Sequence, residues 1–236
     1  MAEGRQPSWP DCLNVRDLGG LPTGDGRCIR YGALIRSDNH TRLSDAGVAA
    51  VRAAGVSRIV DVRTPWECTG YPSPFARDPI YRNLPLSAEG DPYDPSLRIE
   101  QSYVAMLDLH PELLAAAVGA IADAPAGGVV VHCHAGKDRT GNVVALTLSL
   151  AGVPAAAVAA DYAVLDDIRA VFDDQPAGLD DPVQRDELDE TFTARPESML
   201  AVLQHMDDTY GGAEAYLRHG GLTTAQIDAV RARLVS

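Results

Sequence analysis

The stretch that most constrains this chain is His-Cys-His-Ala-Gly-Lys-Asp-Arg-Thr-Gly, at residues 132–141. Three consecutive valines at 129–131 precede it and predict a buried strand, because β-branched residues favour strands. The residues that follow, 142–150, are rich in Ala, Leu and Val and predict a helix. The chain should therefore pass from a buried strand through a short polar loop into a helix N-terminus. Such a turn directs backbone N–H groups and the helix dipole toward one point, which makes a cradle for an anion.

The spacing of Cys133 and Arg139 indicates what this cradle does. A cysteine attacks phosphorus only as a thiolate, and a helix N-terminus with nearby cations such as Lys137 and Arg139 favours that form. The planar guanidinium of Arg139 can hold two phosphoryl oxygens at once, which an ammonium cannot do. Loop amides would hold the oxygens as charge develops, and the Thr140 hydroxyl is expected to donate to the sulfur.

Two other interpretations of the loop fail on its residues. A nucleotide-binding P-loop needs Gly-x4-Gly-Lys-Ser/Thr, but Asp138 follows Gly136-Lys137 and Val131 stands where the first glycine belongs. A zinc site at residues 132–134 is excluded because consecutive side chains point apart and no Cys-x2-Cys pair occurs in the chain. The loop therefore predicts neither a metal nor a cofactor.

The loop resembles the signature His-Cys-x-x-Gly-Lys-Asp-Arg-Thr-Gly of a bacterial tyrosine-phosphatase-like family, which includes tyrosine, dual-specificity and phosphoinositide phosphatases. Four further segments resemble parts of that family in the same order. They are Asn14-Val15-Arg16-Asp17-Leu18-Gly19-Gly20, Arg36-Ser37-Asp38, Asp61-Val62-Arg63, and Tyr210-Gly211 with Tyr216-Leu217. The resemblance spans nearly the whole chain and implies the cysteine-phosphatase fold.

The family resemblance also implies roles for residues of the loop. Cys133 would be the nucleophile, Arg139 would bind the phosphoryl group, and Asp138 would protonate the leaving oxygen. A movable acid on a separate loop is the alternative to Asp138, and the candidates for it are Asp91 and Asp94.

Other residues are expected to bind the phosphate or to support the loop. The predicted phosphate-binding residues are His134, Ala135, Gly136, Lys137 and Thr140, and the predicted supporting residues are His132, Asp61 and Arg63. His132 should order the loop by hydrogen bonding. Asp61 and Arg63 end a predicted strand at the sheet edge where ligands gather. Arg63 would either contact substrate or pair with Asp61 or Asp17.

The rest of the chain predicts a single α/β domain over residues 1–236, with a central, mostly parallel sheet flanked by helices and a helical C-terminal part. Strands are expected within 14–36 and at 56–62, 80–84 and 129–131. Helices are expected at 44–54, 98–108, 111–124, 142–150 and 155–165, around 199–206, and at 223–234. Residues 64–78 and 87–96, which are punctuated by Pro, Gly and Asp, are expected to be loops.

The net charge of −13 argues against binding to nucleic acid or stable docking on anionic membranes. Residues 173–190 hold eight acids and one base, so 166–195 is expected to be an acidic lid or a surface loop. No stretch approaches the roughly 20 apolar residues of a membrane span, and the first residues lack a signal core. We therefore expect a cytoplasmic protein without membrane insertion.

The expected activity is metal-independent hydrolysis of a phosphomonoester through a phosphocysteine intermediate, which releases inorganic phosphate. Phosphotyrosine in proteins is the first expected substrate. Phosphoinositides are the alternative, because Lys137, the only lysine in the chain, resembles the lysine-bearing loops of inositol-lipid phosphatases. A phosphate-binding module without turnover is a third hypothesis.

Overall fold

The computed structural model describes residues 7–92, 94–165 and 193–236. Its centre is a mixed five-stranded sheet of order β1-β2-β5-β3-β4, in which only the β1–β2 pair is antiparallel. The strands are β1 (Arg16–Asp17), β2 (Leu34–Ser37), β3 (Val56–Asp61), β4 (Tyr81–Asn83) and β5 (Gly128–His132). The predicted α/β class with a mostly parallel sheet is confirmed.

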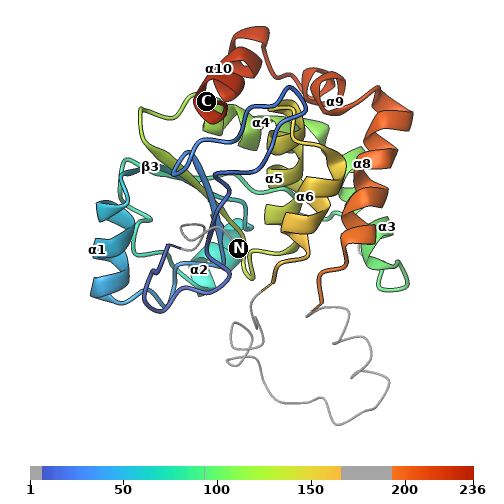
Figure 1. Cartoon of the computed structure of the whole chain (residues 1–236). Helices are drawn as coiled ribbons and strands as arrows, with labels where there is room; N and C mark the ends of the chain where they lie inside the picture. Colours follow the sequence, from blue (N-terminus) through green and yellow to red (C-terminus); the bar gives the residue numbers. More distant parts are fainter. Residues whose placement is uncertain (1–6, 93, 166–192) are drawn as a thin grey trace.

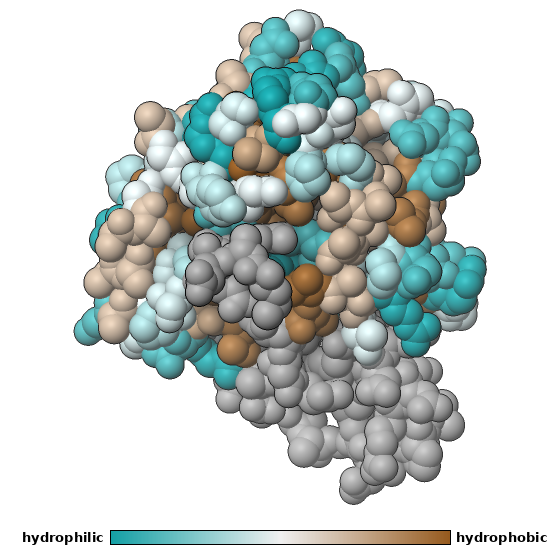
Figure 2. Space-filling view, in the orientation of Figure 1, coloured by the Kyte–Doolittle hydropathy of each residue, from teal (hydrophilic) through white to brown (hydrophobic). Residues whose placement is uncertain are grey.

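Helices flank this sheet, and the C-terminal part is helical as predicted (Figure 1). They are α1 (Asp45–Ala53), α2 (Pro65–Gly70), α3 (Ile99–Leu109), α4 (Pro111–Ala122), α5 (Asp138–Leu150), α6 (Ala155–Tyr162), α8 (Pro196–Tyr210), α9 (Ala213–His219) and α10 (Thr224–Leu234). On the face of the molecule seen in Figure 2, hydrophilic residues cover much of the top and right, and hydrophobic residues form patches between them.

The central strand β5 divides the hydrophobic core into two layers. Val129 and Val131 belong to the larger cluster, which α4, α5 and the C-terminal helices cover. Val130 belongs to the smaller cluster on the other side, together with Val51 of α1. Side chains of a strand alternate between its two faces, so a strand of consecutive valines can serve both layers. This central position fixes the end of β5, where the predicted cradle begins.

Helices α2 and α5 differ from the sequence-based expectation in ways that have a local cause. Helix α2 lies in the stretch 64–78 that was expected to be a loop, because Thr64 and Glu67 form a capping box around Pro65 at the first helical position. Helix α5 begins at Asp138, four residues before the apolar run at 142–150. Apolar periodicity could not mark this first turn, because its residues are polar.

Among the described helices, none is by itself long and apolar enough to cross a membrane; α3 and α4 meet that length and composition only as a pair bent by 84°. The predicted acidic lid falls almost entirely on residues 166–192, which lie outside the described part of the chain.

Candidate active site

The loop that carries Cys133 lies at the carboxyl ends of three parallel strands. Strand β5 ends at His132, which pairs with Ser37 at the end of β2 and with Asp61 at the end of β3. Cys133 follows directly and is 3% exposed. Lys137 caps the N-terminus of α5, whose first residues are Asp138 and Arg139. The positive end of the α5 dipole is therefore directed at the loop.

Gly136 shows why the loop needs a glycine. Its φ is +70°, which few residues with a side chain adopt, and a Cβ there would lie 2.2 Å from the carbonyl oxygen of Ser37. The loop thus packs directly on the end of β2, which brings Cys133 and the start of α5 close together.

The carbonyl groups of the loop are held from outside by two asparagines. Asn14 Nδ2 donates to the carbonyl oxygens of Ala135 and Gly136, at 3.1 Å each. The backbone N–H and Nδ2 of Asn39 both donate to the carbonyl of His134 at 2.9 Å. In a trans peptide the C=O of one residue and the N–H of the next point in opposite directions. The N–H groups that follow these carbonyls therefore point away from the two asparagines.

A buried ionic cluster supports the loop from below. Arg36 Nη2 donates to the Gly136 carbonyl at 2.8 Å, and its Nη1 lies 3.1 Å from Asp161 Oδ2. Arg16 Nε lies 3.5 Å from the other oxygen of Asp161, and all three side chains are at most 3% exposed. Breaking such a buried pair is costly, so the cluster connects β1, β2 and α6 firmly to the loop.

Glu67 of α2 forms a bidentate ion pair with Arg139. Arg139 Nη1 lies 2.6 Å from Glu67 Oε2, and Nη2 lies 2.7 Å from Oε1. Burial raises the pKa of Glu67, but hydrogen bonding and charge from Arg139 outweigh it and lower the pKa to about 2. Thr64 Oγ1 also donates to Glu67 Oε2, at 3.0 Å. This bidentate contact fixes the plane of the guanidinium.

Asp138 is held by Tyr103, whose hydroxyl also contacts Tyr162. The Tyr103 hydroxyl donates to Asp138 Oδ1 and lies 2.7 Å from the Tyr162 hydroxyl. Lys137 Nζ lies 3.5 Å from the same Asp138 oxygen. Tyr103 and Tyr162 are at most 2% exposed, whereas the Asp138 side chain is 39% exposed. Asp138 therefore combines a rigid anchor with access to a molecule at the mouth of the cradle.

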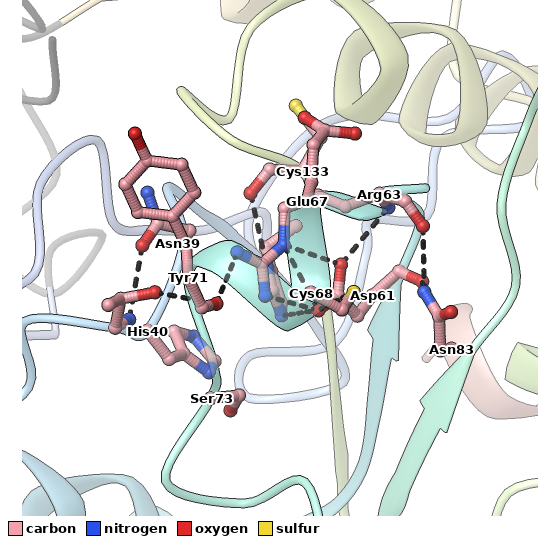
Figure 3. Close-up of polar contacts among 12 residues, drawn as sticks. Asn39, His40, Asp61, Arg63, Glu67, Cys68, Tyr71, Ser73, Asn83 and Cys133 are labelled. Atoms are coloured by element: carbon pink, nitrogen blue, oxygen red, sulfur yellow. Dashed lines mark hydrogen bonds and ion pairs between the residues drawn. The ribbon is translucent and has the colours of Figure 1, made fainter. Parts of the chain in front are cut away.

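The predicted supporting residues lie together beneath the cradle. His132 Nδ1 contacts the Cys133 carbonyl at 3.1 Å, and its Nε2 lies 3.6 Å from Asp61 Oδ2. Arg63 pairs with Asp61 through Nη2 at 2.7 Å and donates to the Tyr71 carbonyl at 2.9 Å (Figure 3). Burial raises the pKa of Asp61, but the charges of His132 and Arg63 outweigh it and lower that pKa. Arg63 thus pairs with Asp61 and not with Asp17.

Thr140 departs from expectation. Its Oγ1 is fully buried and has no hydrogen-bond partner among the described residues, so the expected hydrogen bond to Cys133 Sγ is not formed. Buried hydroxyls usually have a partner. The role of Thr140 in phosphate binding stays a prediction.

His134 is half-buried and meets the ring of Tyr71 edge-on, with 5.2 Å between the ring centroids.

The alternative acids Asp91 and Asp94 lie on a different wall of the site. A cavity of about 430 Å³ is bounded by residues of the stretches 86–92 and 94–97, by one side of α3 and by Arg139. Within it Asp91 contacts His110 Nε2 at 2.9 Å, and Asp94 accepts from Ser96 Oγ at 2.6 Å. Apolar side chains such as Met106 and Leu109 line much of the remainder.

No group of three or more His, Cys, Asp or Glu side chains that could hold a metal ion occurs among residues 7–92, 94–165 and 193–236. The structure places Glu67, Tyr103 and Asn14 at the loop. The sequence assigned no site role to Glu67 or Tyr103, and Asn14 entered only through the family resemblance of residues 14–20. A signal existed for Glu67, because Thr64-Pro65-Trp66-Glu67 is a capping-box pattern that would have revealed α2. Nothing in local spacing connects Tyr103 with Asp138.

Comparison with known proteins agrees with this geometry. Residues 7–236 match the tyrosine phosphatase family. The chain is 32% identical to a tyrosine-protein phosphatase of Nostoc commune, over 90% of this chain and 78% of the relative. It is 28% identical to the triple specificity protein phosphatase PtpB of Mycobacterium tuberculosis, over 96% of this chain and 98% of the relative. The chain therefore belongs to the tyrosine phosphatase family.

Proposed function

We propose that this protein hydrolyses phosphotyrosine in proteins through a phosphocysteine intermediate, without a metal ion. The observation that carries the proposal is the outward fixing of the loop carbonyls by Asn14 and Asn39. It directs the loop amides at the position that a phosphoryl group would occupy in front of Cys133. Amides held in place before the reaction stabilise developing charge without reorganisation.

The first step transfers the phosphoryl group to sulfur. The Cys133 thiolate attacks phosphorus in line with the ester oxygen, an S–P bond forms, and the P–O bond to the tyrosine breaks. Arg139 and the loop amides hold the three remaining oxygens. Asp138 gives its proton to the departing phenolic oxygen.

The second step regenerates the enzyme. A water molecule attacks the phosphorus of phosphocysteine and gives a proton to the Asp138 carboxylate. The S–P bond breaks, so the thiolate and inorganic phosphate are released. The same aspartate thus acts first as an acid and then as a base, and its partial exposure suits both roles because leaving group and water approach from the solvent side.

The cavity beside Arg139 supports an aromatic leaving group. Its volume of about 430 Å³ and its apolar walls suit a phenyl ring with part of a peptide. Phosphoinositides are the second candidate, since one relative carries a triple specificity name and Lys137 lies in the loop. Against this substrate, Lys137 is only 1% exposed and its ammonium lies near Asp138.

The test is phosphate release in the presence of a chelator. A phosphotyrosine peptide, a phosphoserine peptide, and mono- and polyphosphorylated inositol lipids are compared, with Cys133→Ser as the control. The proposal expects the tyrosine peptide to have the highest kcat/KM and Cys133→Ser to be inactive. Preference for the lipids would replace the substrate, metal-dependent turnover would refute the mechanism, and no turnover of any substrate would favour a phosphate-binding module.

A further inference from the structure

A second pocket lies beside β3, β4 and α4, apart from the loop that carries Cys133. Its volume is about 410 Å³, and Arg58 of β3 and Arg82 of β4 line it. No residue of the loop 132–141 takes part in its walls. Arg58 pairs with Val129 near the start of β5, three residues before His132, which corresponds to about 10 Å along the strand.

Strand register directs both arginines to the same side of the sheet. Arg58 lies two residues before Val60, so the two side chains share a face. Val60 pairs with Arg82 in the parallel β3–β4 ladder, which places Arg82 on that face as well. This face turns toward α4, whose Ala116 and Gly119 present little side-chain volume. The hollow between the arginines and α4 is the pocket.

Arg58 is the unusual residue of this pocket. It lies in the central part of β3 and is only 9% exposed. Its Nε and Nη1 are buried and have no hydrogen-bond partner within the described residues. Arginine is rarely buried unless it is paired, because an unpaired charge is costly to remove from water. An anion in the pocket would supply the counter-charge that this buried guanidinium needs.

The acids of the pocket already have other partners. Glu112 Oε1 contacts His110 at 3.1 Å, and Asp123 Oδ2 accepts from Gln226 at 2.9 Å. Burial lowers the pKa of Arg58 most, and the charge of Arg82 lowers it further. The charge of Asp123 raises this pKa but only partly offsets the shift. The pocket thus brings together two arginines and two carboxylates, and neither carboxylate forms an ion pair with Arg58 within the described residues.

We propose that this pocket, the Arg58 pocket, binds a phosphate group, either as free phosphate or as part of a small phosphate ester. A phosphate dianion can neutralise both guanidinium groups and accept several of their N–H bonds, whereas a carboxylate carries a single charge. The volume leaves room for an organic portion beyond the phosphate. The site lies outside the catalytic cradle, so binding there does not depend on the proposed activity.

The test is a titration of the full chain followed by the backbone amide NMR signals of Gly119, Gly221 and Leu222, which line the pocket. The protein carries Cys133→Ser, and the probes are inorganic phosphate, glycerol 2-phosphate and acetate. Occupation of the catalytic cradle is followed separately through Gly136, so the two sites are distinguished. We expect saturable shifts at the pocket with both phosphate probes and much weaker binding of acetate.

Three variants decide the assignment. Arg58→Met should weaken phosphate binding about tenfold or more, since it removes charge-assisted hydrogen bonds. Arg82→Met, at an exposed position that does not endanger the fold, should weaken it severalfold, and Arg77→Met, an exposed arginine outside the pocket, should leave it unchanged. Tighter binding of glycerol 2-phosphate would assign the pocket to an ester, and equal or tighter binding of phosphate to the free ion. Unsaturable shifts, equal binding of acetate, or unchanged affinity in both pocket variants would overturn the proposal.

Discussion

The two halves of the active site are built differently. In the phosphate-binding half, the loop from Cys133 to Lys137 is tied by Asn14, Arg36 and Asn39, all at most 4% exposed. In the leaving-group half, the Asp138 side chain is 39% exposed, and the cavity beside Arg139 is bounded in large part by residues of the stretches 86–92 and 94–97. Buried, multiply bonded groups have one arrangement, whereas exposed loop residues have several.

This difference teaches which part of the function is encoded most strictly. The phosphate-binding half has geometry for one chemical group, so it predicts a phosphatase. In the proposed mechanism the leaving-group half supplies a proton donor and an apolar wall, which many phosphate esters can use. Predictions that separate the two halves should therefore show large losses for every substrate in the first and substrate-dependent losses in the second.

Arg139→Lys should give the largest effect of these substitutions and the least selective one. A lysine can neither form the bidentate pair with Glu67 nor hold two phosphoryl oxygens, so kcat/KM should fall about 1000-fold. The measurement is steady-state hydrolysis of a phosphotyrosine peptide, phenyl phosphate and 4-nitrophenyl phosphate. Losses that differ strongly among the three substrates would show that the two halves are not separable.

Asp138→Asn should give a loss that depends on the substrate. Asparagine cannot donate a proton to the leaving oxygen, so phenyl phosphate should lose about 100-fold in kcat. 4-Nitrophenyl phosphate should lose much less, because its leaving group departs readily as the anion. An equal loss for both esters would move the acid role to Asp91 or Asp94, and the same comparison on Asp91→Asn and Asp94→Asn would identify it.

Glu67→Gln tests whether the phosphate-binding half depends on the orientation of Arg139. Loss of the bidentate ion pair with Arg139 should reduce kcat/KM about tenfold for all substrates, because a small misplacement of a catalytic group lowers the rate strongly. Glu214→Gln, which disturbs an exposed ion pair with Arg231, is the matched control and should change activity little.

The pH dependence of this effect follows from the lowered pKa of Glu67. Because the pKa of about 2 lies below the usual 4.5, the Glu67–Arg139 pair contributes stability above about pH 4.5 and loses it as pH falls toward 2. The ratio of wild-type to Glu67→Gln activity should therefore be constant between pH 5 and 8. A ratio that changes across this range would mean that Glu67 takes part in proton transfer.

The same contrast explains what could be predicted from the sequence. The phosphate-binding half depends on local order along the chain: β5, Gly136 and α5 follow one another within residues 128–150. A motif can encode such a unit, so Cys133, Arg139 and the parallel sheet were predictable. The helix α2 was also encoded locally, by Thr64 and Glu67, although apolar periodicity alone does not reveal it.

Contacts between distant segments could not be predicted in this way. Arg139 and Glu67 are 72 residues apart, and Asp138 and Tyr103 are 35 apart. Both pairs depend on how the sheet and α3 pack, so no rule based on spacing along the chain relates their two members. Lys137 illustrates the same limit, since its position suggested a residue offered to substrate, whereas tertiary packing leaves it 1% exposed.

Tyr103→Phe should give the smallest effect and the most informative one. Phenylalanine fills the same buried space but removes the hydroxyl that anchors Asp138, so phenyl phosphate should lose about threefold to tenfold in kcat while KM changes little. 4-Nitrophenyl phosphate should be nearly unaffected. Tyr216→Phe is the control. It also removes a buried hydroxyl that bonds to α3, because Tyr216 donates to the Leu107 carbonyl of that helix, but it is far from Asp138 in the chain. If both variants lose activity equally toward both esters, the Tyr103 hydroxyl stabilises the fold only. A selective loss in Tyr103→Phe would instead show that a rigid contact positions the acid within the otherwise permissive half of the site.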